Sequence, residues 1–404
     1  MVLRSAGKLP MRKSRWSFVL AGVGVLLLAG VVYAWSVLSV SIAQEFPDWS
    51  RAKLSLTFTL LMAFFCIGQI SCGFVGARMK PRTGIWLGGT LLLAGFVVSA
   101  RMSSIAMLYL GFGVLGGFGS GFAYIAVMSS VVKWFPEKRG LVSGILLMGF
   151  GLSSFLIGKL FQAWTPAVAG AWRASFLVLG AVTFAVLFAC GFFVRRPIET
   201  EKSGGGEGLT TGQMLKKPKF WFYYLWELML TAAGLMIISQ ASGITADALP
   251  AVSAGAAATL VGLISIANGL GRVLFGTLYD KAGRRVSMLL ICLCFAAAMG
   301  LLLVAVKTSG TAVLTCAFIL LGLGYGGIPV CNSAFIGASF GMAHYQTNFP
   351  VCNSAMLPAS FGGTLAGALY DGAGAYSGVF LVILAFAAVG LLCSGGITAL
   401  DRTK

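Results

Sequence analysis

The sequence predicts an all-α integral membrane protein in which twelve membrane-spanning helices form two pseudo-symmetric six-helix bundles. Three observations carry this prediction. Only 10% of the 404 residues are charged and 58% are hydrophobic, whereas a water-soluble domain carries about 25% charged residues to cover its surface. Apolar stretches of about 20 residues, the length that crosses a bilayer, recur along the chain. A polar segment divides these stretches into two sets of six.

The first six stretches each hold enough apolar residues to cross the bilayer once. They lie at residues 17–43, 54–77, 84–100, 105–132, 141–164 and 174–194. The first is too long for a cleavable signal peptide, so we expect it to remain as an anchor. Gly113, Gly117 and Gly121 recur every four residues in the fourth stretch, which favours a close packing seam with a neighbouring helix.

The polar segment at residues 196–218 is the predicted linker. It contains the run Lys-Ser-Gly-Gly-Gly-Glu at residues 202–207, a composition typical of a flexible connection. Six more apolar stretches follow it, at residues 220–243, 256–278, 286–306, 312–340, 347–370 and 378–400. We therefore divide the chain into an N-terminal bundle at residues 1–195, a cytoplasmic linker, and a C-terminal bundle at residues 219–404.

The distribution of basic residues predicts the orientation in the membrane. With both termini placed inside, 22 of the 29 lysines and arginines fall on the inner side and five on the outer side. Inner loops of membrane proteins carry such an excess of positive charge. The bias predicts a multi-pass protein of the cell (inner) membrane with cytoplasmic termini. It also explains the net charge of +18 without a nucleic-acid partner.

Signals for enzymes, metals and cofactors are missing from the sequence. The nine cysteines lie inside apolar stretches without the spacing of metal ligands, and the single histidine, His344, has no cluster of ligands around it. No Gly-Lys-Ser phosphate-binding loop occurs, which argues against transport driven directly by ATP. We predict a non-enzymatic protein that needs no cofactor and contacts membrane lipids.

Two loops repeat at a spacing of 203 residues and carry a family resemblance. The segment at residues 276–285 (GTLYDKAGRR) aligns with residues 73–82 (GFVGARMKPR). The segment at residues 276–285 resembles the signature loop of the major facilitator superfamily. The resemblance implies a conformational latch between helices on the inner side, formed by Asp280, Lys281, Arg284 and Arg285. Topology signalling alone is the alternative role for these basic residues. The first-half copy has Ala77 and Pro81 where the family carries Asp and Arg.

A second resemblance concerns three short motifs in the N-terminal half. Lys133-Trp-Phe-Pro-Glu-Lys-Arg-Gly140, Tyr33-Ala-Trp-Ser36 and Trp172-Arg-Ala-Ser-Phe176 together resemble the oxalate:formate antiporter family, which is related to the monocarboxylate transporters. The pattern extends over most of the chain. It implies a secondary transporter for small organic anions, and a monomer by analogy with the family.

Arg272 is the strongest candidate for binding substrate. A charge inside a membrane span costs about 2.5–3.5 kcal/mol and needs a reason to persist. Its guanidinium can clamp a carboxylate with two hydrogen bonds, and Asn268 lies one turn earlier on the same face. The family resemblance also implies a substrate-binding arginine at this place. The alternative is a structural arginine that bonds backbone carbonyls or lipid head groups on the inner side.

The sequence departs from the resembled families at two positions. The oxalate transporters carry a lysine in the eleventh span, but residues 347–358 (TNFPVCNSAMLP) contain none. One cation suits one carboxylate, so we favour a monocarboxylate over oxalate. The monocarboxylate transporters carry Asp four residues before the arginine, where Asn268 stands here, and an asparagine cannot carry their proton. Glu227 in the seventh span is a possible proton-coupling residue, or else it partners a neighbour or the interface.

Further candidates for the substrate site come from aromatic and amide side chains. Pro-Val-Cys-Asn-Ser-Ala occurs twice, around Asn332 and Asn353, and these amides bind substrate or join helices to one another. A mid-span proline loosens its helix where the backbone lines a cavity. Other predicted lining residues are Tyr33, Tyr124 and Tyr325, of which Tyr33 is an alternative member of the interfacial aromatic belt. Gln69, which matches Arg272 under the 203-residue spacing, is predicted to face it.

Together these observations predict a secondary active transporter that moves a small organic anion, most simply a monocarboxylate, by rocker-switch alternating access with Arg272 as the carboxylate anchor. The site is expected between spans one, two, four, seven, eight, ten and eleven. One alternative is a transporter of a bulkier carboxylate or an amphiphilic, drug-like compound. A membrane sensor of anions that does not transport is a further alternative.

Overall fold

The computed structural model describes residues 12–76, 79–166, 168, 170–197 and 208–402, so the predicted flexible run at residues 202–207 lies outside the described residues. Ten of the described helices are long and apolar enough to span a bilayer. One of these, α12 (Ala254–Thr308), turns at Gly283 (φ 77°) and supplies two crossings. Three shorter helices supply the remaining crossing, which confirms the twelve-helix prediction. The φ of Gly283 lies in a region that side-chain-bearing residues avoid.

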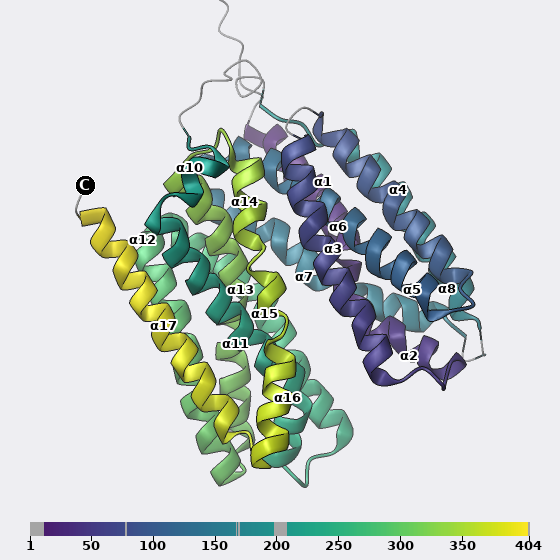
Figure 1. Cartoon of the computed structure of the whole chain (residues 1–404), viewed down its shortest axis with the longest axis vertical. Coiled ribbons are helices and arrows are strands. Elements are labelled where there is room, and N and C mark those ends of the chain that lie inside the picture. The colour runs from purple at the N-terminus through teal and green to yellow at the C-terminus, as the bar shows by residue number, and fades with distance from the viewer. Residues whose placement is uncertain (1–11, 77–78, 167, 169, 198–207, 403–404) are drawn as a thin grey trace, which may run out of the picture.

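The N-terminal bundle occupies one side of the molecule (Figure 1). Its helices are α1 (Arg12–Ala29), α2 (Trp35–Glu45), α3 (Arg51–Val75), α4 (Pro81–Ala100), α5 (Ile105–Leu108), α6 (Gly117–Val131), α7 (Arg139–Trp164) and α8 (Trp172–Gly191). A 3₁₀ turn at Gly30–Ala34 joins α1 to α2 within the first crossing. A π-helical segment at Tyr109–Gly116 joins α5 to α6 within the fourth.

The C-terminal bundle occupies the other side. Its helices are α10 (Thr211–Leu215), α11 (Pro218–Ala248), α12, α13 (Thr311–Phe340), α14 (Tyr345–Asn353), α15 (Met356–Ala359), α16 (Gly362–Ala373) and α17 (Ser377–Arg402). Pro350 lies inside α14, and the eleventh crossing is divided into α14, α15 and α16. Proline removes a backbone donor and clashes with the preceding turn, which fits the predicted loosening of this crossing.

Glycine seams hold neighbouring crossings together in both bundles. A Cβ atom on Gly117 or Gly121 of α6 would clash with backbone atoms of α3. A Cβ atom on Gly322 or Gly326 of α13 would clash in the same way with α12. The seam predicted for the fourth crossing is therefore confirmed, and the tenth crossing has its counterpart. Close backbone approach is the usual way in which membrane helices associate.

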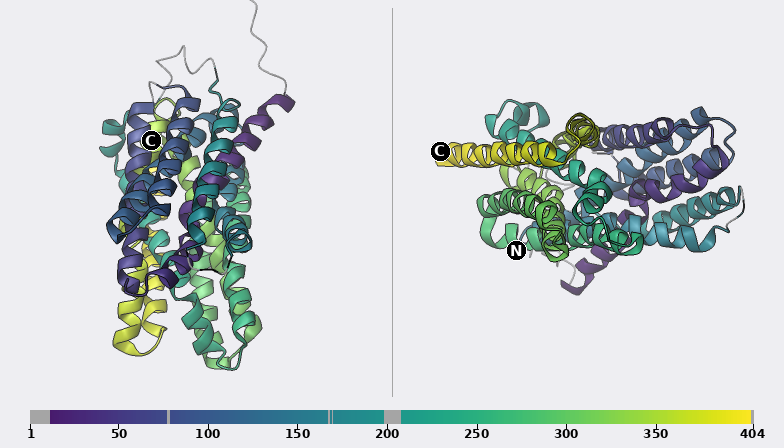
Figure 2. Two further views of the ribbon diagram at one scale, coloured as in Figure 1. Left: turned by 90° about the vertical axis from the view of Figure 1, so that its right-hand side faces the viewer. Right: turned by 90° about the horizontal axis from the view of Figure 1, so that it is seen from below.

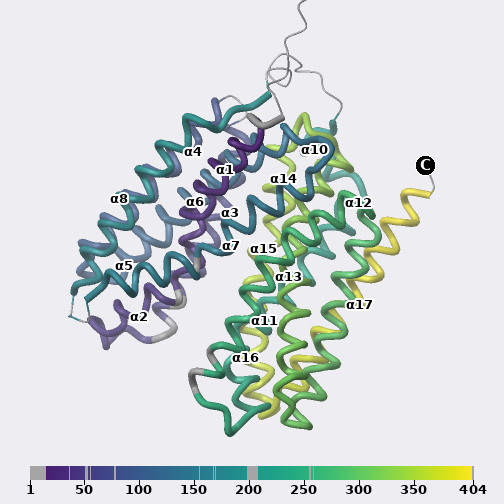
Figure 3. The backbone as a smooth tube through the Cα atoms, turned by 180° about the vertical axis from the view of Figure 1, so that it is seen from behind, coloured from purple at the N-terminus to yellow at the C-terminus, as the bar shows by residue number. Residues whose placement is uncertain are grey.

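The two bundles converge at one end and separate toward the other (Figures 1 and 3). We call the end with α10 and the start of α14 the linker end, and the end with α2 and α16 the far end. Figure 2 shows the bundles side by side when viewed along their length. Among the described residues, the hydrogen bonds between bundles run from the linker end to the centre. The linker end is thus the closed end in this structure.

Candidate functional site

A cavity lies between the bundles at the point where their contacts end. It encloses about 500 Å³ of space between atoms, a figure that includes its opening to solvent. Its walls come from both bundles, and they are formed by Tyr33, Phe65, Tyr124, Leu147, Phe150, Glu227, Thr231, Arg272, Tyr325, Ile328, Pro329, Asn353 and Met356. Every crossing predicted to contribute does so. The prediction omitted α7, which supplies Leu147 and Phe150.

Arg272 lines this cavity and is 4% exposed. Its Nε donates a hydrogen bond to Oδ1 of Asn268, one turn earlier on α12 (3.4 Å). Its Nη1 donates to the backbone carbonyl of Leu147 in the opposite bundle, a carbonyl contact of the kind expected for the structural alternative. Among the described residues no carboxylate forms an ion pair with Arg272. The guanidinium therefore lines the cavity without an ion pair to any described carboxylate.

The position of the guanidinium depends on a glycine of α7. A Cβ atom on Gly151 would lie 2.9 Å from Cζ of Arg272, closer than side-chain packing allows. Gly144, two turns earlier, likewise leaves room for the backbone of Arg272. Neither glycine was singled out in the sequence. Their role depends on which helix packs against α7, and spacing along one helix does not show that.

Aromatic side chains form the wall of the cavity on the side of the N-terminal bundle. The ring of Phe150 meets Tyr33 edge-on (5.3 Å between centroids) and Tyr124 at 5.1 Å, and Phe65 packs against Tyr124 at 5.5 Å. Tyr325 lies on the C-terminal side, over Gly234. The three tyrosines predicted from the sequence thus lie in the cavity wall.

The predicted amides lie near the cavity but have different neighbours. Asn353 lines the cavity, and its Nδ2 donates to Oε1 of Gln69 across the bundles (2.9 Å). Gln69 therefore contacts Asn353, whereas the sequence prediction placed it opposite Arg272. Asn332 is buried behind the wall, where its Nδ2 donates to Oε1 of Glu227 (2.6 Å). Both asparagines make the interhelical bonds that were the alternative to substrate binding.

Glu227 and Thr231 lie one turn apart on α11 and both line the cavity. Glu227 is 3% exposed, and its Oε2 accepts a hydrogen bond from Sγ of Cys352 on α14 (3.2 Å). Thr231 was missed in the sequence, although residues four apart share a helical face and Glu227 had been singled out. Among the described lining residues, the cavity therefore carries one guanidinium and one carboxyl group.

Asp280 joins the two bundles at the linker end. Its two carboxylate oxygens accept hydrogen bonds from the backbone N–H groups of Gly140 and Leu141, each at 2.8 Å. These groups lie in the first turn of α7, where unpaired N–H groups and the helix dipole favour a negative charge. Arg139, beside them, donates to the carbonyl of Gly337 on α13 (3.4 Å).

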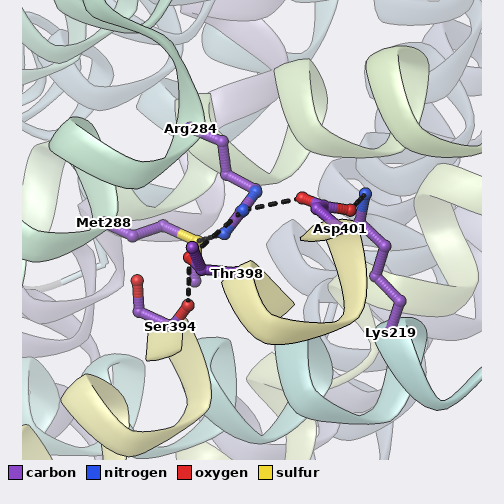
Figure 4. Close-up of polar contacts among 6 residues, drawn as sticks. All are labelled: Lys219, Arg284, Met288, Ser394, Thr398 and Asp401. Carbon is purple, nitrogen blue, oxygen red and sulfur yellow. Dashed lines mark hydrogen bonds and ion pairs between the residues drawn. The ribbon is translucent and has the colours of Figure 1, made fainter. Parts of the chain in front are cut away.

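The other predicted latch residues act elsewhere. Arg284 pairs with Asp401 of α17 (2.8 Å), which also pairs with Lys219 of α11 (2.8 Å), so this network joins helices of the C-terminal bundle only (Figure 4). Thr398 on α17 accepts a second bond from Arg284 (3.4 Å). The side chains of Lys281 and Arg285 are exposed.

Different residues join the two bundles beside the first-half copy of the loop. Ala77, its counterpart of Asp280, lies outside the described residues. Nearby, the side-chain amide of Gln346 donates to the carbonyl of Cys72 at the end of α3 (3.1 Å). Arg196 donates both to the carbonyl of Gly76 (3.0 Å) and to Oε1 of Gln346 (2.7 Å). No motif in the sequence pointed to Gln346.

The chain resembles known transporters in sequence. The sequence profile of the Major Facilitator Superfamily matches residues 20–356. The oxalate:formate antiporter of Oxalobacter formigenes is 26% identical over 340 residues, which cover 82% of this chain and 80% of the antiporter. Monocarboxylate transporter 13 of Bos taurus is 28% identical over 272 residues, which cover 66% of this chain and 61% of that protein.

The fold agrees with that of a solved transporter. The structure of FucP, a Major Facilitator Superfamily transporter in the outward conformation, superposes with a TM-score of 0.73 at 14% sequence identity, and the match covers 94% of this chain and 99% of FucP. The matched family profile covers most of the twelve crossings. This chain belongs to the Major Facilitator Superfamily and is a multi-pass transporter embedded in the membrane.

Proposed function

We propose that this protein is a secondary active transporter that moves a small monocarboxylate, with Arg272 as the carboxylate anchor. The observation that carries the proposal is the buried guanidinium of Arg272 in a cavity between the bundles, with no described carboxylate paired to it. A buried charge of this kind is costly unless an opposite charge reaches it. Arginine suits a carboxylate because its planar fork of donors matches the two oxygens.

The composition of the cavity wall favours one carboxylate over two. Arg272 is the only lysine or arginine among the described lining residues. Glu227, on another wall, would repel a second carboxylate while it is ionised. The tyrosine and phenylalanine rings supply an apolar surface for the rest of a small molecule. These features agree with the similarity of the chain to an oxalate:formate antiporter and a monocarboxylate transporter, and they favour the monocarboxylate.

The bundles are proposed to rock about this cavity, so that it opens alternately at each end. We place the linker end and both termini in the cytoplasm of a cell whose inner membrane holds the protein, because basic residues concentrate at that end. This structure then faces outward, and the protein works as a monomer. The Arg272 bond to the Leu147 carbonyl joins the bundles at the cavity. A bound carboxylate would compete for the same donors and so act directly on a contact that closes the linker end.

Counterflow in proteoliposomes tests the proposal. Vesicles are loaded in turn with formate, acetate, lactate, pyruvate, oxalate and larger carboxylates, and uptake of the labelled compound is measured. We expect a monocarboxylate to accumulate with the wild type and with Arg101→Gln, whose side chain is exposed in the turn after α4. Arg272→Gln should abolish accumulation.

Two results would contradict the proposal. Counterflow that survives Arg272→Gln at the wild-type rate would remove Arg272 as the anchor. A wild type that responds only to larger amphiphilic carboxylates would favour the bulkier substrate class.

A further inference from the structure

A second ionisable group lines the cavity, and carboxylate binding by Arg272 does not use it. Glu227 accepts hydrogen bonds from Asn332 of α13 (2.6 Å) and Cys352 of α14 (3.2 Å). Three crossings of the C-terminal bundle therefore meet at one buried carboxyl group. Among the described residues, no lysine or arginine forms an ion pair with it. No ion pair with a described residue therefore holds Glu227 in its ionised form.

Both partners of Glu227 can serve either form of the carboxyl group. The amide of Asn332 has donors on Nδ2 and an acceptor on Oδ1, and this Oδ1 is buried without a hydrogen-bond partner. Rotation of the amide by 180° would present Oδ1 to Glu227 in place of Nδ2, so that a protonated Glu227 could donate to it. The thiol of Cys352 is likewise both a weak donor and a weak acceptor. A lysine or arginine in their place could only donate.

The other titratable groups facing Glu227 come from four helices. They are Cys66 of α3, Tyr124 of α6, Tyr223 and Tyr224 of α11 itself, and Cys352 of α14. Arg272 of α12 faces it from another wall of the cavity. Tyrosine and cysteine are ordinarily neutral near pH 7, and arginine keeps its proton. Of these groups, Glu227 is therefore the one that can gain and lose a proton during transport.

We propose that Glu227 is a proton-binding site, so that each monocarboxylate moves together with one proton. This inference rests on the proposed function. At the open end, the Glu227 carboxylate takes a proton from hydronium, which leaves water and a neutral acid. After the bundles rock, the acid returns that proton to water on the other side. With proton and substrate bound, the Arg272 cation balances the substrate anion, and no net charge crosses the low-dielectric centre.

The position of this site differs from the route implied by the family resemblance. Asn268 stands one turn before Arg272 on α12. Asn268 cannot take up a proton, and it accepts a hydrogen bond from Arg272. The carboxyl group that lines the cavity lies on α11, where its partners are Asn332 and Cys352.

The test uses the full-length chain in proteoliposomes with an inward proton gradient. The probe is whichever of formate, acetate, lactate and pyruvate gives the strongest counterflow, with protein-free vesicles subtracted for passage of the free acid through lipid. One-to-one coupling predicts about tenfold accumulation for each pH unit, since one unit and a tenfold ratio are the same free energy. A pH dye inside the vesicles should report acidification that follows uptake.

Glu227→Gln should retain counterflow within about threefold of the wild type but lose gradient-driven accumulation and acidification. The control is Glu137→Gln, which makes the same change at an exposed residue of the loop before α7, and it should accumulate like the wild type. If Glu227→Gln is inactive in both assays, the wild-type dye measurement decides. Acidification that follows uptake supports the inference, and its absence overturns it.

Two further outcomes separate this inference from the proposed function. Gradient-driven accumulation by Glu227→Gln, or counterflow without any response to the gradient in the wild type, would overturn the proton site and leave carboxylate transport standing. Absence of wild-type counterflow with every carboxylate would overturn the proposed function itself.

Discussion

The two pseudo-symmetric loops at the linker end close the molecule with different chemistry. In the C-terminal half, a carboxylate of α12 accepts two backbone N–H groups at the start of α7. In the N-terminal half, carbonyl groups at the end of α3 accept from Gln346 of α14 and from Arg196. In both halves the helix before the loop accepts and the crossing packed against it donates, but the acceptor is a charged carboxylate in one half and a backbone carbonyl in the other. The comparison suggests that the Asp280 contact contributes more to closure, because it has a full charge on a helix N-terminus.

The largest expected effect follows from Asp280→Asn. The change removes one charge and replaces one of two acceptors with a donor facing a backbone N–H. Hydrogen bonds to charged groups contribute about 1.5–3 kcal/mol each. The equilibrium between the states with the linker end closed and open should therefore shift toward the open state by about tenfold to a hundredfold. Ser143→Cys with Ser333→Cys reports the closed state, since the two hydroxyl oxygens lie 2.6 Å apart across the bundles.

Oxidation should cross-link this cysteine pair efficiently in the parent chain and much more slowly once Asp280→Asn is added. The single-cysteine variants are the controls for the native cysteines. Equal cross-linking with and without Asp280→Asn would show that the Asp280 contact does not hold the linker end closed.

Gly151→Ala should have the next largest effect, and it tests the contact between bundles at the cavity. The added Cβ would lie 2.9 Å from Cζ of Arg272, so the guanidinium must shift away from the Leu147 carbonyl. We expect the half-saturating substrate concentration in counterflow to rise about tenfold, because the displaced guanidinium loses its geometry toward the substrate carboxylate and a hydrogen bond to a charged group contributes about 1.5–3 kcal/mol. Gly262→Ala on α12 has open space around its Cβ position and should leave transport unchanged. If Gly151→Ala leaves the half-saturating substrate concentration unchanged, the position of Arg272 beside Gly151 does not matter for substrate binding.

Gln346→Ala should have a smaller effect, and it tests the contact at the end of α3 in the N-terminal half. It removes a neutral hydrogen bond to the carbonyl of Cys72, which contributes about 0.5–1.5 kcal/mol. It also removes one acceptor of Arg196, which keeps its bond to the carbonyl of Gly76. We expect the rate of Ser143–Ser333 cross-linking to fall severalfold, less than in Asp280→Asn. A larger fall in Gln346→Ala than in Asp280→Asn would reverse the proposed ranking of the two contacts.

The smallest effect is expected from Arg284→Gln. Its partner Asp401 has a side chain that is 40% exposed and also pairs with Lys219. Exposed pairs contribute about 0–1 kcal/mol, and this one lies within the C-terminal bundle. Cross-linking of the serine-derived pair and counterflow should both stay within about twofold of the parent. A tenfold change in either would show that the Asp401 network senses the state of the bundles.

Much of the fold could be predicted because hydropathy and glycine spacing are local properties of the sequence. The crossings, the glycine seam of α6, and a cavity with Arg272 and three tyrosines all follow from residue type and position within a helix. The missed features depend on which helices meet. The carbonyl of Leu147 is a backbone group that any residue carries. Gly151 matters only because Arg272 packs against it, and Gln69 contacts Asn353 because α14 packs against α3.

The central claim is that the Arg272 guanidinium binds the carboxylate, and calorimetric titration of the purified protein tests it most directly. The wild type, Arg272→Gln and Arg101→Gln are each titrated with the monocarboxylate that gives the strongest counterflow. Removing one partner of a buried charge pair costs about 2–5 kcal/mol, so the account predicts affinity at least about thirtyfold weaker in Arg272→Gln and unchanged in Arg101→Gln. Equal affinity of Arg272→Gln and the wild type would contradict it.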